Sequence, residues 1–177
     1  MKNFRLLMMA VAGCLAFTSC SDDDNDTNMN NGNQNADLTG TYRMTSWNAP
    51  MAADFNGDGV SGTNMMTESN CYNNSMMTVN NDGTYTMTYN TMNINNGTSS
   101  CGTETTAGTW TRNGNSFATS HMSGGQSMNT NYSFASGTGA GGTTLTRSMN
   151  NWQYPSMDID GNMMYSTGNV NMVMTRQ

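Results

Sequence analysis

Short segments in which apolar and polar residues alternate follow one another along most of this chain. The clearest runs over 84–89, where Tyr85, Met87 and Tyr89 are separated by threonines. Alternation with a period of two residues is typical of a β-strand that buries one face. The pattern therefore predicts a strand whose Tyr85, Met87 and Tyr89 side chains point into a core.

Turn residues between such segments predict antiparallel hairpins. Asn-Asp-Gly at 81–83 separates 75–80 from the strand just described, and glycine supplies the positive φ that a tight turn needs. A second hairpin is predicted by Asn-Gly-Asn at 113–115. This second hairpin joins 108–112 to 116–119. Further pairs are expected between 131–135 and 143–149 and between 163–165 and 169–174, and 40–47 is expected to be the first strand.

No segment beyond residue 37 has a helical period of useful length. Roughly eight to ten strands in sequential hairpins predict an all-β, antiparallel up-and-down meander that closes into a barrel, with a small β-sandwich as the alternative. Leucine and isoleucine are scarce while methionine reaches 20 residues, so methionine is expected to fill the core. One domain over 38–177 accommodates this pattern.

The first 37 residues have a different character. A basic start and an apolar run over 6–17 are typical of a secretory leader, here 1–19, and Cys20 follows at its end. An acidic tract comes next, and 20–37 is expected to be a flexible tether. The transition predicts that Cys20 becomes a lipidated first residue that anchors the protein to a membrane. Cys14 is the alternative, but it leaves a shorter apolar run and no acidic flank.

Charge narrows the classes of partner. The formal net charge is -6, and the only cations beyond the leader are Arg43, Arg112, Arg147 and Arg176. Binding to nucleic acid requires clustered lysine and arginine to neutralise phosphates. A nucleic-acid partner is therefore not expected.

The order of these features resembles the lipocalin-like lipoproteins of Bacteroidota-type bacteria. The resemblance rests on the leader, Cys20 and the acidic spacer, followed by Leu-Thr-Gly-Thr-Tyr at 38–42, the loop at 54–59, Cys71, Asn-Asp-Gly-Thr-Tyr at 81–85, Cys101 and Gly-Thr-Trp at 108–110. In the first strand, Tyr42 stands where lipocalins have tryptophan. The resemblance implies a lipid-anchored protein of the outer membrane that faces the cell exterior, with the periplasmic face as the alternative.

The resemblance implies a shape more than an activity. The lipid anchor, the meander of strands and the absence of a nucleophile–base set predict a non-catalytic barrel that binds a small apolar molecule or has a structural role. We expect a cavity lined by the inward residues of two hairpins, namely Tyr85, Met87, Tyr89, Trp110 and Phe117. No serine-hydrolase or zinc-protease motif is present, and His121, the only histidine, is expected to point outward. The alternative is a surface module that binds a glycan or a partner through exposed Trp47 or Trp152 and a calcium-ordered loop.

Two further features predict specific chemistry. Cys71 and Cys101 are the pair that remains once Cys14 and Cys20 are assigned to the leader and the anchor, so a disulfide is expected in an exported domain. Asp54, Asn56 and Asp58 place oxygen atoms on alternate residues of Asp-Phe-Asn-Gly-Asp-Gly, as in the first half of a calcium loop. Glu68 is the candidate for the remaining carboxylate. The alternative is an ordinary surface turn, which is also expected at 158–162.

Overall fold

The computed structural model describes residues 38–137 and 142–177. The leader, the tether and Cys20 lie outside the described residues. The elements in chain order are β1 (Gly40–Ala53), β2 (Gly62–Asn64), α1 (Met65–Glu68), the 3₁₀ turn η1 (Asn70–Tyr72), β3 (Met76–Val79), β4 (Thr84–Asn95), β5 (Thr98–Asn113), β6 (Ser116–Ser123), β7 (Gln126–Ala135), β8 (Thr144–Met157) and β9 (Met163–Arg176).

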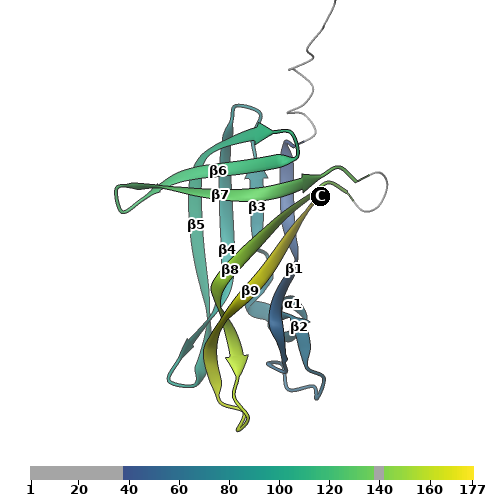
Figure 1. Ribbon diagram of the computed structural model, residues 1–177, viewed down its shortest axis with the longest axis vertical. Coiled ribbons are helices and arrows are strands. Elements are labelled where there is room, and N and C mark those ends of the chain that lie inside the picture. The colour runs from purple at the N-terminus through teal and green to yellow at the C-terminus, as the bar shows by residue number, and fades with distance from the viewer. Residues whose placement is uncertain (1–37, 138–141) are drawn as a thin grey trace, which may run out of the picture.

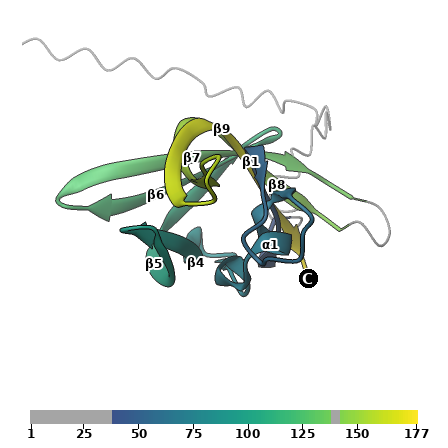
Figure 2. The same ribbon diagram turned by 90° about the horizontal axis from the view of Figure 1, so that it is seen from below.

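The strands form an antiparallel meander that closes on itself (Figures 1 and 2). From β3 onward each strand pairs with the next in sequence, β1 pairs with β3, and β9 returns to pair with β1. The short strand β2 adds to β1 outside this ring of eight. The predicted all-β barrel is confirmed, and the strands do not form the alternative β-sandwich. Within the described ranges, no helix has the length and apolar character needed to cross a bilayer.

The predicted hairpins at 81–83 and 113–115 are present, as β3–β4 and β5–β6. The predicted pairing of 131–135 with 143–149 is also present, as β7–β8. Two hairpins extend beyond the prediction: β4 and β5 continue to a turn at 96–97, and β6 and β7 meet at 124–125. Positive φ angles at Asn96 and Gly97 are what a tight two-residue hairpin turn requires.

The predicted hairpin between 163–165 and 169–174 is wrong, because both segments belong to the single strand β9. Gly168 lies within this strand and permits a close approach: a Cβ atom there would lie 2.7 Å from Cγ of Pro50. The turn is at 158–162, where the Asp158 carboxylate accepts hydrogen bonds from the backbone N–H groups of Asp160 and Asn162. The ordinary turn expected there is confirmed.

Strand pairing around the barrel is uneven. β6 pairs with β5 only over Thr109–Asn113, and β7 pairs with β8 only over Ser133–Ala135. The rest of β5 pairs only with β4, and β8 beyond Thr146 pairs only with β9. The β6–β7 hairpin therefore crosses one end of the barrel and projects to its side (Figure 1). All eight strands pair continuously only at that end, which we call the closed end.

Aromatic side chains fill the closed end. The ring of Phe117 lies between Trp110 and Tyr132, with centroid separations of 5.7 Å and 5.6 Å. These three residues are called the closed-end cluster. The Trp110 indole also donates to the carbonyl of Asn80 at 2.8 Å, which fixes the ring above the β3–β4 turn. Tyr42, at the start of β1, is fully buried and donates to the carbonyl of Leu38.

A disulfide joins Cys71 in η1 to Cys101 in β5, with a Cα–Cα distance of 5.0 Å. The predicted bridge is confirmed. It attaches the long β1–β3 connection to the part of β5 that has a strand neighbour on one side only. Beside it Tyr72 stacks on Trp47, and both rings are buried. The disulfide therefore holds the packed Trp47 and Tyr72 rings near the part of β5 that pairs only with β4.

Candidate functional site

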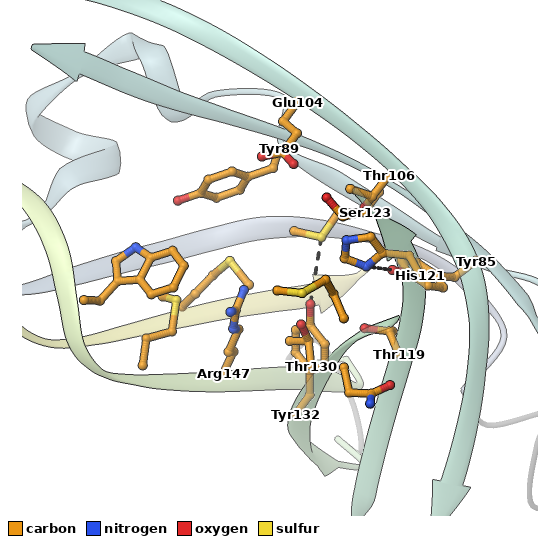
Figure 3. Close-up of a pocket in the computed structure, with 16 residues that line it drawn as sticks. Tyr85, Tyr89, Glu104, Thr106, Thr119, His121, Ser123, Thr130, Tyr132 and Arg147 are labelled. Atoms are coloured by element: carbon orange, nitrogen blue, oxygen red, sulfur yellow. Dashed lines mark hydrogen bonds between the residues drawn. The ribbon is translucent and has the colours of Figure 1, made fainter. Parts of the chain in front are cut away.

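A cavity of about 310 Å³ lies inside the barrel beside the closed-end cluster (Figure 3). Its wall comes from β4 to β9, with the larger share from β6, β7 and β8. The lining residues are Tyr85, Met87, Tyr89, Glu104, Thr106, Thr119, His121, Ser123, Met128, Asn129, Thr130, Tyr132, Arg147, Met149, Trp152 and Met172. The volume is at the lower end of the range for pockets that hold organic ligands.

The alternation of β4 places its predicted residues as expected. Tyr85, Met87 and Tyr89 all line the cavity. Trp110 and Phe117, predicted for the same wall, instead belong to the closed-end cluster and do not line the cavity. They lie where β5 and β6 are still paired, so their rings fill the interior there rather than bordering a space.

His121 corrects the prediction that it points outward. It follows Phe117 and Thr119 at intervals of two on β6, so all three side chains lie on the inner face. Its Nδ1 atom lies 3.2 Å from the Tyr85 hydroxyl, and the two side chains meet across the cavity wall (Figure 3). The histidine is therefore half-buried and hydrogen-bonded to a side chain of β4.

A β-bulge in β8 brings Trp152 to the cavity. Leu145, Arg147 and Met149 share the inner face, and the register then shifts before Trp152. Asn151 has a φ of 52°, so an extra residue is accommodated and Trp152 returns to the cavity side. The Arg147 guanidinium consequently lies over the Trp152 ring, 5.2 Å from its centroid.

Two tyrosine hydroxyls add polar groups to this apolar wall. The Tyr89 hydroxyl accepts a 2.9 Å hydrogen bond from the Trp47 indole, and the Tyr132 hydroxyl makes a long contact of 3.9 Å to the Met87 sulfur and also interacts with the Thr119 side chain. Burial raises the pKa of Tyr89, and it raises the pKa of Tyr132 to about 12. The positive charge of Arg147 opposes both increases. Both hydroxyls therefore stay protonated at neutral pH and can donate.

The lining does not assemble a hydrolytic set. His121 contacts a tyrosine hydroxyl, and Glu104, the single acid of the lining, is an exposed residue of β5. A general base of the serine-hydrolase kind requires a nucleophile within hydrogen-bond reach and a group that orients the base. The arrangement is better suited to holding a molecule, with methionine and tryptophan for its apolar part and hydroxyls and a guanidinium for a polar part.

The loop predicted to bind calcium is held by internal hydrogen bonds. The Asp54 carboxylate accepts from the backbone N–H groups of Gly57, Asp58 and Gly59 at 2.7, 3.2 and 2.8 Å. Asn56 accepts from the Asp58 backbone at 2.9 Å and donates to the Asp58 carboxylate. These contacts are those of an Asx-rich turn, which gives the loop a defined shape without an ion.

Glu68, the fourth predicted ligand, is buried in α1 with 5% of its surface exposed. Its Oε1 lies 3.3 Å from the Thr67 hydroxyl, while Oε2 has no hydrogen-bond partner among the described residues. In the part of the chain that the structure describes, no three aspartate, glutamate, histidine or cysteine side chains gather as a metal site would require. Calcium binding at Asp54, Asn56, Asp58 and Glu68 stays a prediction.

The tryptophans differ in what they can contact. Trp47 and Trp110 are 1% and 6% exposed, so neither is available for a glycan at the surface, contrary to the expectation for Trp47. Trp152 is 41% exposed and lies at the cavity. Surface stacking on a sugar is therefore limited to Trp152 among the three.

Sequence reasoning did not identify Arg147, Tyr132 or His121 as cavity residues, although the signal was present. Arg147 lies between Leu145 and Met149 in an alternating segment, and Tyr132 shares a face with Phe134. A polar residue at an inward position of a barrel strand is a candidate for ligand contact. The position of Trp152 had no such signal, because the bulge at Asn151 changes which residues point inward.

Comparison with known families identifies the fold. Residues 38–139, more than half of the chain, match the family model of the lipocalin-like domain. The chain belongs to the lipocalin-like domain family, whose barrel form suggests a module that binds small molecules. No curated protein and no solved structure matches the chain.

Proposed function

We propose that this protein is a non-catalytic binding protein that holds one small, partly apolar organic molecule in its barrel. The observation that carries the proposal is the cavity of about 310 Å³, which lies next to a fully packed end. Methionine side chains along its wall can adapt to ligands of different shape.

A cavity-filling variant tests this binding. Thr130 lines the cavity from β7 and is only partly buried, so Thr130→Trp places a large ring in the space without replacing a core residue. The neutral, environment-sensitive dye Nile red is expected to gain fluorescence on binding the wild-type chain and to lose at least tenfold in affinity for the variant. Met122→Trp, at an exposed position of β6, is the control and should bind as the wild type does. Equal binding by all three proteins would place the dye elsewhere and contradict the proposal.

We further propose that the protein is attached to the outer membrane by a lipid on Cys20 and faces the cell exterior. The support is the sequence alone: the apolar run ends at a cysteine, and an acidic tract follows it. Labelled palmitate is expected to be incorporated by the wild type and by Cys14→Ala, and not by Cys20→Ala. Incorporation that persists in Cys20→Ala would overturn this assignment. Protease treatment of intact cells then separates an exterior from a periplasmic location.

A further inference from the structure

Arg147 is the single cation of the cavity wall. It is half-buried, and Figure 3 shows its guanidinium reaching from β8 into the cavity. The guanidinium carbon lies over the Trp152 ring, 5.2 Å from the ring centroid. The N–H groups of a guanidinium lie in its plane, so a ring over one face leaves the hydrogen-bonding edge available.

Within 38–137 and 142–177, no acidic group forms an ion pair with Arg147. Among the residues that the structure describes, no hydrogen bond or ion pair involves the Arg147 guanidinium, and its one contact of this kind is with the Trp152 ring. Glu104, the acid of the same cavity, lies on β5 at the exposed rim, and Figure 3 shows it on the wall away from Arg147. A partly buried charge without a hydrogen-bonded partner is costly, which is why such charges are usually paired.

Two hydroxyl groups face the same space and have donors to spare. Tyr89 uses its hydroxyl oxygen to accept from Trp47, so its own proton is available to another acceptor. Tyr132 interacts with the Thr119 side chain and donates its proton in a 3.9 Å contact to the Met87 sulfur, which is a weak acceptor. The electrostatic influence of Arg147 on both tyrosines indicates that the three groups share one polar region.

We infer that the ligand of this cavity is a monocarboxylic acid with an apolar body, whose carboxylate pairs with Arg147. This inference rests on the proposed binding function. A planar carboxylate matches the guanidinium edge with two parallel hydrogen bonds. The methionines of the wall, Met87, Met149 and Met172, border the same space and accept the apolar body. A doubly charged phosphate fits less well, because one cation would face two negative charges with Glu104 at the rim.

Isothermal titration of the purified full chain with decanoate, decanol and methyl decanoate tests the inference. The three probes share the chain length and differ at the head group. Decanoate is expected to bind at least about tenfold more tightly than decanol or the ester, as a charge-assisted hydrogen bond pair predicts. Arg147→Met should remove this preference by weakening decanoate at least tenfold while leaving decanol within threefold. Glu104→Gln should strengthen decanoate slightly, because it removes a negative charge from the rim.

Arg112→Met is the matched control. Arg112 also lies over an aromatic ring, at 4.6 Å from the Phe134 centroid, but it does not line the cavity. Decanoate binding should be unchanged in this variant. If Arg147→Met does not fold, the comparison of acid, alcohol and ester on the wild type still decides the question.

The outcomes separate the two proposals. Equal binding of decanoate and decanol by the wild type, with Nile red displaced by both, would overturn the inference about the carboxylate and leave the binding function standing. Absence of binding by all three probes and by Nile red would overturn the binding function itself. A preference for decanoate that survives Arg147→Met would show that another group recognises the carboxylate.

Discussion

The closed end of the barrel and the cavity beside it are built from the same strands, but their inward positions are filled differently. At the closed end Trp110, Phe117 and Tyr132 pack ring against ring where all strands are paired. In the cavity the inward positions hold methionines, hydroxyls and one arginine, where β5 and β8 each lack one strand neighbour. One section of the sheet therefore stabilises the barrel, and the neighbouring section borders the space proposed for binding.

The largest difference between the two regions should appear when one side chain is truncated in each. Phe117→Ala removes a fully buried ring from the closed-end cluster and should lower the free energy of unfolding by about 4 kcal/mol. Met149→Ala enlarges a space that already exists and should cost about 2 kcal/mol. Urea denaturation of both variants measures the difference. Equal losses would mean that the cavity wall is packed as tightly as the closed end.

The disulfide tests whether the open section of β5 depends on its attachment to η1. Replacing both Cys71 and Cys101 by serine releases a cross-link between residues 30 apart in sequence and should cost about 3 kcal/mol. Since β5 near Cys101 pairs only with β4, hydrogen exchange should rise most over 98–107. Exchange that rises equally at the closed end would show that the bridge stabilises the whole barrel rather than this section.

Gly108 tests how closely β6 must approach β5 where the closed end begins. A Cβ atom there would lie 2.0 Å from the backbone oxygen of Ser120. A backbone atom cannot rotate away as the end of a side chain can. Gly108→Ala should therefore cost about 2 kcal/mol. Gly102→Ala on the same strand meets only the Asn93 side chain, which can rotate away, so it should cost less than about 0.5 kcal/mol. Thermal unfolding of the two variants checks this contrast, and similar midpoints would contradict it.

The sequence predicted the barrel because alternation and turn residues are local signals. Tyr85, Met87 and Tyr89 were placed correctly by a period of two, and the same rule applied to His121 and Arg147 would have placed them inside as well. Other features depend on contacts between distant segments. Gly168 leaves room for the Pro50 ring, and the inward position of Trp152 depends on the bulge at Asn151. How far β6 stays paired with β5 decides whether Trp110 borders a cavity or fills a core, and no local pattern encodes that.

Tyr132 belongs to both regions, and its ionisation gives the smallest of these effects. Its pKa is raised from 10.0 to about 12, chiefly by burial. A raised folded-state pKa means that the folded protein holds the proton more tightly, so this stabilisation is present below pH 10 and is lost as the pH rises towards about 12. The slope is about 1.4 kcal/mol per pH unit for one group. Tyr132→Phe should flatten the decline of unfolding free energy over this interval, measured by urea denaturation at successive pH values, while Tyr165→Phe at an exposed site should not. A decline that is unchanged in Tyr132→Phe would mean that the Tyr132 hydroxyl reaches solvent through the cavity. Tyr132 would then belong to the cavity wall and not to the packed closed end.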